Sequence, residues 1–363
     1  MLGAVVVAFG LRAPRRGPRR RRRTPRERGR CSGMSHTEEV SRPQYVNDHD
    51  DGVVTGLDAE FQAMRPRLLG VAYGLLGSLD EAEDVVQDAW LRLRSAKAGD
   101  GGDEIRDVTG WLVVTVSRLA LDVLRSARHR REEYVGPWLP EPILTGPALT
   151  GPALTGPVAQ PDPADRVTLD ESLSMAMLVV LESLSPAERT AFVLHDVFGL
   201  TFAEVGEAVG RSPAACRQLA ARARAHVASR APRFEVDPSK HRRVVHAFAR
   251  ACLGDDMDAL VALLDPDVVL RSDGGGRVRA GRRPVFGAAK VARLLFGIRR
   301  FGRFELVPVG VNGWPGLLRY HGDRLVSVLG LTVAGGRVTA VDMVLNPEKL
   351  ARVTRADETR RSR

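Results

Sequence analysis

The chain has 363 residues and a formal net charge of +10, but the excess positive charge lies at one end. Eleven of the 54 basic residues and one of the 44 acidic residues fall within residues 1–30, so the remainder is electrically balanced. Overall charge is therefore no argument for nucleic-acid binding, and a basic footprint must be local. Three widely spaced cysteines without a CxxC pair exclude a zinc cluster and a disulfide scaffold, and predict a reducing cytoplasmic location.

Residues 1–56 are predicted to be a disordered, arginine-rich leader. The apolar run from Leu2 to Leu11 is too short to span a membrane and precedes the positive charge, unlike a signal peptide. Met34 is followed by Ser-His-Thr-Glu-Glu and reads like a natural start, so residues 1–33 are interpreted as a non-native leader. The alternative is a basic tail that binds phosphate nonspecifically.

Residues 57–131 carry helical periodicity and are predicted to form a first all-α domain. In one helix, apolar residues from Ala82 to Leu93 recur at i, i+3, i+4 and i+7, while residues 80–88 contain five acids and no base. A solvated outer face is the plain explanation of such a run. In the next helix, polar residues share one face at i, i+4, i+7 and i+11, namely Arg118, Asp122, Arg125 and His129.

Residues 132–168 are predicted to be a linker, because eight prolines at short intervals prevent a helix. Leu-Thr-Gly-Pro recurs three times within it, at a period of five residues. The segment Tyr134–Pro142 differs from a simple spacer, because it places Tyr134, Trp138 and Leu139 in an extended stretch. We therefore expect this segment to dock on another part of the molecule.

Residues 169–233 are predicted to form a second all-α domain with a helix-turn-helix. Ser185 with Glu188 and Thr201 with Glu204 fit capping boxes, and Ser212-Pro213 starts a longer helix. That helix and its flanks carry five arginines and no acid. A recognition helix would place such residues on base edges and phosphates. The candidates are Arg211, Arg217, Gln218, Arg222 and Arg224. The alternative is a solvated, arginine-rich helix of an all-α bundle.

Residues 238–350 are predicted to form an α+β domain, followed by a tail at 351–363. Residues 324–333 and 337–344 alternate in polarity and read as antiparallel strands, with Gly335-Gly336 at the hairpin turn.

This order of motifs resembles the bacterial sigma-70 family. The run from Asp80 to Leu93 resembles the polymerase-binding helix of that family, and residues 111–122 resemble the helix that it uses on the minus-ten promoter element. Leu-Ser-Pro-Ala-Glu-Arg at 184–189 resembles the start of its minus-35 domain, and the absence of other sigma regions resembles the extracytoplasmic-function subfamily. Residues 134–142, 273–277 and 346–350 resemble the branch with a SnoaL-like extension.

The resemblance implies two all-α sigma domains joined by a Pro-rich linker, and a C-terminal SnoaL-like, NTF2-like cone. It implies a factor that binds core RNA polymerase through the β′ clamp helices and the β flap, and that directs promoter-specific initiation. No enzymatic activity, metal or cofactor is expected. The implied clamp contacts are Asp84, Gln87 and Asp88. Promoter contacts near the minus-ten element are Arg118, Asp122, Arg125 and Arg128. We also expect regulatory contacts between the C-terminal domain and the linker, at Tyr134, Trp138, Asn346, Pro347, Lys349 and Leu350.

Two other functions stay open at this point. One is a ligand-sensing helix-turn-helix repressor, which has no need for the acidic helix. The other is a small-molecule isomerase or hydrolase, because SnoaL-like folds resemble ketosteroid isomerase, in which a carboxylate acts as a base. The candidates are Asp273, Asp323 and Asp342, with His321 and Tyr320 beside them, although Asp at such turns usually serves local backbone hydrogen bonds. Ligand binding without turnover would also suit an apolar pocket.

Overall fold

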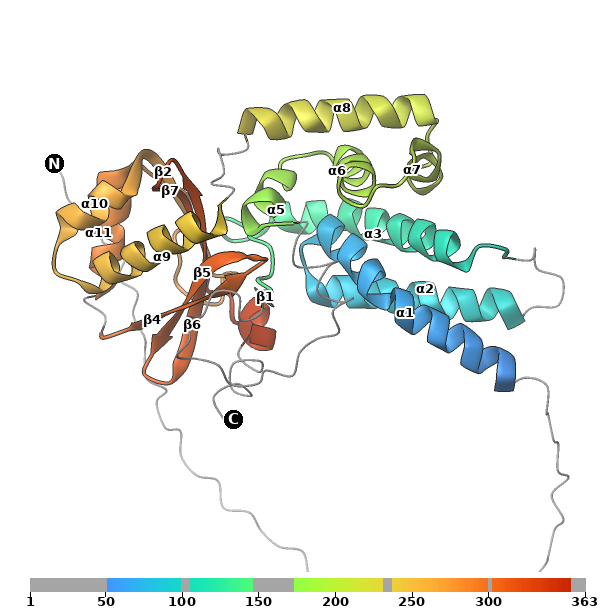
Figure 1. Cartoon of the computed structure of the whole chain (residues 1–363), viewed down its shortest axis with the longest axis horizontal. Helices are drawn as coiled ribbons and strands as arrows, with labels where there is room; N and C mark the ends of the chain where they lie inside the picture. The colour runs from blue at the N-terminus through green and yellow to red at the C-terminus, as the bar shows by residue number, and fades with distance from the viewer. Residues whose placement is uncertain (1–50, 99–104, 146–172, 231–236, 300–301, 354–363) are drawn as a thin grey trace, which may run out of the picture.

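The computed structural model describes residues 51–98, 105–145, 173–230, 237–299 and 302–353. Residues 1–50 of the expected leader and the second and third Leu-Thr-Gly-Pro copies lie outside these residues. The bound predicted for the leader, residue 56, is wrong, because residues 51–56 belong to a helix that begins at Asp51. Within them, a helical part occupies one side of the molecule and a sheet with its own helices the other (Figure 1). No helix in the described ranges is long and apolar enough to cross a membrane.

The first part of the chain folds into three helices, α1 (Asp51–Leu76), α2 (Leu79–Ala98) and α3 (Val108–Glu132). The predicted apolar stripe of α2 is buried, since Ala82, Val85, Val86, Ala89 and Leu93 all face the core. Asp80 and Glu81 occupy its first turn, where negative charge is favoured by the helix dipole.

The second helical part contains α5 (Met175–Leu181), α6 (Pro186–Phe192), the π-helical turn η2 (Val193–Val197), α7 (Phe202–Val209) and α8 (Pro213–Arg230). Both predicted capping boxes are present, at Ser185 and at Thr201. Gly210 ends α7 with a φ of 72°, a left-handed conformation that glycine adopts without a steric penalty. Ser212 then caps α8 by accepting from the backbone N–H of Ala215 at 3.3 Å. The predicted helix-turn-helix is confirmed.

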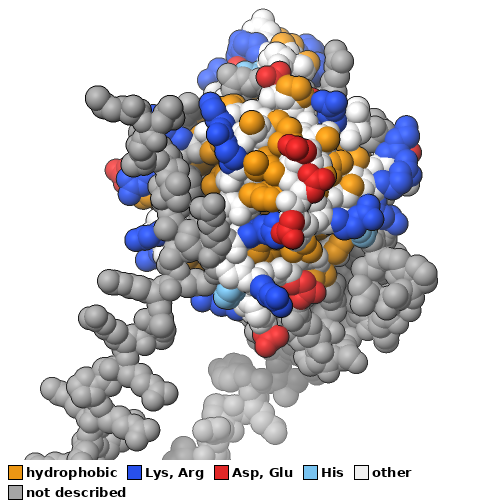
Figure 2. Space-filling model, turned by 90° about the vertical axis from the view of Figure 1, so that its left-hand side faces the viewer, with side chains coloured by type: hydrophobic (Ala, Val, Ile, Leu, Met, Phe, Trp, Pro, Cys, Tyr) orange, Lys and Arg blue, Asp and Glu red, His pale blue; other side chains and the backbone are white. Residues whose placement is uncertain are grey.

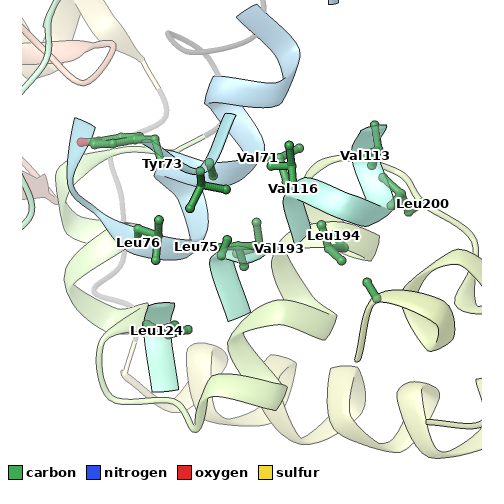
Figure 3. Packing of buried hydrophobic residues seen from close by; sticks show 14 of the residues in the cluster. Val71, Tyr73, Leu75, Leu76, Val113, Val116, Leu124, Val193, Leu194 and Leu200 are labelled. Carbon is green, nitrogen blue, oxygen red and sulfur yellow. The ribbon is translucent and has the colours of Figure 1, made fainter. Parts of the chain in front are cut away.

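The two helical parts share one hydrophobic core. Figure 3 shows Leu75 and Leu76 of α1 and Val116 of α3 packed near Val193 and Leu194 of the second part. Arg189 of α6 is buried in this interface, where it pairs with Glu182 and donates to the backbone oxygen of Gly74 in α1 through Nε at 3.4 Å and Nη2 at 3.3 Å. The two helical parts therefore pack against each other as one unit rather than as two independent domains.

The C-terminal part is α+β, as predicted. Its helices are α9 (Pro238–Leu253), α10 (Met257–Leu263) and α11 (Ala288–Ile298). Its strands are β2 (Leu264–Asp273), β3 (Val285–Phe286), β4 (Glu305–Val311), β5 (Trp314–His321), β6 (Arg324–Ala334) and β7 (Arg337–Val344). Gly335 and Gly336, both with positive φ, form the predicted two-residue turn between β6 and β7.

The sheet has the order β1-β4-β5-β6-β7-β2-β3, and its first strand comes from the linker. Strand β1 (Leu144–Thr145) pairs antiparallel with Val311 and Gly310 of β4. One face of the sheet packs on α9, α10 and α11, which gives the cone its own core. The other face receives Leu139 of the linker and Met175 of α5. The C-terminal domain is thus fastened to both the linker and the second helical part.

Candidate nucleic-acid interface and interdomain contacts

The acidic surface of α2 consists of Asp84, Gln87 and Asp88, all of which are exposed. They are exposed because the buried stripe of α2 occupies the opposite side of the helix. The three residues implied as the polymerase contact therefore lie together on an accessible face. A negative surface of this kind suits a basic partner.

Arg352 bridges the C-terminal end of the chain to the first turns of α2. It lies in a helical stretch at residues 347–353, and its guanidinium reaches Asp80 at 2.5 Å and Glu83 at 2.7 Å. Its hydrogen bonds to the Glu83 carboxylate, and then to that of Asp80, raise the pKa of Arg352 above its ordinary value. The sequence analysis assigned Arg352 to a tail at 351–363, whereas the helical stretch continues to residue 353, and no local signal pointed to this contact. The acids beside the exposed surface of α2 are thus held by the C-terminal domain.

Asp273 gathers the linker and the C-terminal end of the chain around a single buried carboxylate. It accepts from the Tyr134 hydroxyl at 2.6 Å, from the Leu139 backbone N–H at 2.9 Å and from Lys349 Nζ at 2.8 Å. It also accepts from the backbone N–H of Gly275 at 3.0 Å, the local turn that the sequence predicted. Burial and the Asp273 carboxylate raise the pKa of Tyr134, so its hydroxyl stays protonated and donates.

Other predicted contact residues join the same cluster. Asn346 donates to the Tyr134 hydroxyl at 3.0 Å, and Lys349 lies over the Trp138 ring at 4.0 Å while also donating to the Leu139 backbone oxygen. Leu350 is buried with Leu139. We call Tyr134, Trp138, Asp273, Asn346 and Lys349 the linker cluster. Pro347 starts the helical stretch that presents Lys349 and Leu350 to it.

Glu141 fastens the linker to the first helical part. Its carboxylate accepts from the backbone N–H of Leu79 at 2.8 Å, and its own N–H donates to the Gly77 oxygen at 2.8 Å. Its backbone oxygen accepts from Tyr73, whose hydroxyl in turn accepts from Asn312 of the C-terminal domain, each at 2.7 Å. Burial raises the pKa of Glu141 above its usual range. Sequence reasoning missed this residue, because its partners lie more than sixty positions away.

Among the predicted promoter residues of α3, Arg118 contacts the helix-turn-helix. Arg118 Nε donates to the backbone oxygen of Glu207 in α7 at 3.0 Å. Arg118 and Arg211 line one open groove, together with the turn before α8. Asp122 and Arg125 remain exposed and form an ion pair at 3.2 Å, while the side chain of Arg128 lies outside the described residues. Two basic residues predicted for different DNA elements are therefore adjacent here.

On α8, the buried stripe of Cys216, Leu219, Ala220 and Ala223 turns the opposite face outward. Arg217 and Gln218 are exposed on this outward face, and the Arg217 guanidinium lies 5.6 Å from the centre of the Phe202 ring. Arg222 and Arg224 flank this face and hold ion pairs within the domain, with Glu188 at 3.0 Å and Asp196 at 2.6 Å. The helix therefore offers Arg217 and Gln218 directly, with Arg222 and Arg224 at its sides.

The three aspartates considered as catalytic bases under the isomerase or hydrolase hypothesis do not lie together in one site. Asp273 is occupied by the linker cluster, and Asp342 is buried in a bidentate pair with Arg271 at 2.5 and 3.1 Å. Asp323 and His321 are exposed in the β5–β6 turn, and Tyr320 packs on the linker side of the sheet. Within the described ranges, no three His, Cys, Asp or Glu side chains are grouped as metal ligands would be. The geometry does not assemble a catalytic site from these residues.

The surface of the C-terminal domain is chemically mixed. Figure 2 shows that hydrophobic, acidic and basic side chains share the end of the molecule that is opposite the helical part. On this face, the described residues form no continuous basic field of the kind that would extend along a nucleic acid. The basic residues predicted to meet DNA lie on α3 and on or just before α8.

Comparisons with known proteins agree with this arrangement. The model for sigma-70 region 2 matches residues 61–130, and that for sigma-70 region 4 matches residues 174–227. The Mycobacterium tuberculosis ECF RNA polymerase sigma factor SigJ is 40% identical over 304 residues, which cover 80% of this chain and 92% of that protein. The probable ECF sigma factor SigI of the same species is 37% identical over 294 residues, covering 81% and 94%. The crystal structure of SigJ matches with a TM-score of 0.61 at 37% identity, over 81% of this chain and 98% of that one.

Proposed function

Because the chain belongs to the extracytoplasmic-function group of sigma-70 factors, which direct promoter-specific transcription initiation by RNA polymerase, we propose that its C-terminal domain regulates that activity from within the chain. The observation that carries the proposal is the Arg352 bridge to Asp80 and Glu83, because it ties this domain to the helix that bears the acidic surface. The factor acts in the cytoplasm, where its polymerase is.

The acidic surface of α2 is proposed to bind the β′ clamp helices of core polymerase. Asp84, Gln87 and Asp88 are exposed and lie one turn beyond the acids that Arg352 holds. A basic clamp approaching this face competes with Arg352 for the same local negative charge. Release of Arg352 and docking of polymerase are then coupled events.

The promoter contacts are proposed to become fully available when the helical parts separate. Arg118 of α3 donates to the backbone of α7 and lines the same groove as Arg211, although the two residues are assigned to different promoter elements. Arg118, Asp122, Arg125 and Arg128 would then meet the minus-ten element. The minus-35 element would meet Arg211, Arg217, Gln218, Arg222 and Arg224, while the same domain contacts the β flap.

The linker cluster is proposed to hold the molecule in this packed arrangement until a signal or a small ligand shifts it. A domain in the same chain has a high effective concentration toward its neighbours, so modest contacts suffice. The cluster supports this role because it joins the linker, the β2 end and the C-terminal helical stretch around Asp273.

The test is run-off transcription with core polymerase and the Arg352→Ala variant. We expect higher transcription from the cognate promoter than with the unmodified factor, because α2 is released from the C-terminal domain. Arg337→Ala, at an exposed position of the β6–β7 hairpin, is the matched control and should leave transcription unchanged. Equal transcription by all three proteins would overturn the proposed regulation while leaving the sigma-factor activity itself intact.

A further inference from the structure

Arg319 lies on the helix-covered side of the sheet. Its neighbours on β5, Leu318 and Tyr320, pack on the linker side, whereas Leu317 packs with α9, α10 and α11. Because side chains alternate along a strand, Arg319 shares the side of Leu317. It is 8% exposed, in a core that is otherwise largely apolar.

Among the described residues, two groups interact with the guanidinium of Arg319. Its Nε donates to Ser327 Oγ at 3.0 Å, and its central carbon lies 5.9 Å from the centre of the Phe304 ring. In the part of the chain that the structure describes, no Asp or Glu forms an ion pair with it. Burial alone lowers the pKa of Arg319 to about 10, so it still carries its charge at neutral pH.

Arg189, the other arginine that is buried among the described residues, pairs with the carboxylate of Glu182. The half-buried Arg271 pairs with both oxygens of Asp342. A buried charge without a counter-charge is costly, and a fold normally supplies a partner. A position that breaks this rule without local compensation is expected to serve a function.

We propose that Arg319 binds the carboxylate of a small organic acid, whose apolar part packs beside Phe304 and Leu306. Leu306 is the β4 residue directly opposite Arg319 in the sheet, and Phe304 precedes β4. Since Ser327 takes Nε, the two terminal nitrogens remain as a planar pair of donors that matches a carboxylate. A single positive charge in apolar surroundings favours a monoanion over a phosphate dianion.

This inference deepens the ligand-binding role proposed for the domain, and it also indicates how binding could reach the linker. Tyr320 follows Arg319 and packs on the opposite face in the same cluster as Leu139. The register between β5 and β6 is irregular between Arg319 and Tyr320. A movement of Arg319 on ligand binding would therefore act on Tyr320, the adjacent residue, which packs with Leu139 of the linker.

The test is calorimetric titration of the full chain with acetate and benzoate, with benzamide as the neutral counterpart of benzoate and inorganic phosphate as a second anion. We expect at least one carboxylate to bind one site, benzamide not to bind, and phosphate to bind more weakly. Arg319→Met should lower carboxylate affinity about tenfold or more, as expected for loss of charge-assisted hydrogen bonds. Arg324→Met, at an exposed position of β6, is the control and should bind as the unmodified chain does.

Stability without ligand separates this role from a structural one. Because Arg319→Met removes an unpaired buried charge, its melting temperature should equal or exceed that of the unmodified chain. Arg319→Lys keeps the charge but loses the planar donor pair, so it should fold and bind the carboxylate more weakly. The proposal is overturned if neither carboxylate binds the unmodified chain more tightly than Arg319→Met, if phosphate binds as well as the carboxylates, or if Arg319→Met melts markedly lower. These results do not depend on transcription, so they leave the proposed regulation to its own test.

Discussion

Single charged residues at two surfaces are the proposed contacts of this factor with its partners. On α2, Asp84 and Asp88 are exposed and make no packing contribution to the buried stripe. On α8, Arg217 projects outward from a helix whose other side is buried. Because all three side chains are exposed, replacing them should affect binding and leave the fold intact.

We predict that Asp84→Arg or Asp88→Arg abolishes binding to core polymerase, because each reverses the charge that faces the clamp. A pull-down with purified core enzyme measures this, and circular dichroism checks the fold. Glu60→Arg makes the same charge change at an exposed position of α1 and should bind as the unmodified chain does. Undiminished binding by both α2 variants would remove these residues from the interface.

We also predict that Arg217→Ala weakens promoter binding by about 1–3 kcal/mol if its contact is bidentate to a base. Arg222→Ala should weaken it less, because Arg222 is paired with Glu188 in the free protein. Fluorescence anisotropy with a promoter duplex measures both affinities at a fixed salt concentration. Promoter affinity that is indifferent to both substitutions would mean that the recognition helix is misplaced.

At the same residue scale, the sequence predicted what depends on near neighbours. The Ser185 and Thr201 caps and the Asp273 turn each involve groups two or three positions apart, so their spacing alone revealed them. Arg352 and Glu141 contact residues that are distant in the chain, and the spacing of residues in the sequence does not show which distant residues come together. Arg319 was missed for another reason. Alternation along a strand predicts which side of the sheet a residue faces, but it does not predict whether an acidic partner lies beside it.

At the scale of elements, α5 belongs to the second helical part and packs against the sheet of the C-terminal domain. Met175, its first residue, packs into the cluster on the linker side of the sheet, and Ser174 caps the helix there. Gly330 of β6 makes room for it, because a Cβ at that position would lie 3.0 Å from Met175 Cγ. The sequence predicted that this region is helical but could not predict that the helix would seat on a sheet.

We predict that Gly330→Val displaces α5 and destabilises the protein by about 1–3 kcal/mol, because added methyl groups overfill a packed interface. Hydrogen exchange should accelerate in residues 175–181, and urea unfolding measures the stability. Gly297→Ala is the matched control, since nothing lies within 4 Å of a Cβ there and alanine favours the helix α11. Unchanged exchange in α5 would show that Met175 does not hold this contact.

At the scale of the whole molecule, the helical parts and the C-terminal domain are joined by several independent contacts. The Arg352 bridge reaches α2, the linker cluster holds residues 134–139, and α5 enters the sheet. The family resemblance correctly indicated the two sigma regions and a mixed α and β C-terminal part, and the motifs that suggested regulatory contacts do lie together. The sequence could not predict that the two helical parts share one core. Helical periodicity shows which face of a helix is buried, but not which other element packs against that face.

We predict that truncation after Arg233 changes promoter activity markedly, because it removes every contact of the C-terminal domain. Truncation from Asn346 should change it differently, since the sheet remains while Lys349, Leu350 and Arg352 are lost. Run-off transcription measures both, and small-angle scattering should show a more extended molecule after the first truncation. If both shortened chains transcribe like the full chain, the extension is not a regulator.

Strand β1 has a consequence for how this gene can change over generations. Leu144–Thr145, which extends the sheet at β4, belongs to the first of three copies of Pro-x-Leu-Thr-Gly that follow Glu141 directly. Tandem copies are prone to in-frame gain and loss when DNA is replicated. Loss of any one copy still leaves Pro-x-Leu-Thr-Gly after Glu141, with Ile143 replaced by alanine at most, and Ile143 meets Asn312 through its backbone groups. The tether can therefore lengthen or shorten among descendants while each inherits the same anchoring strand.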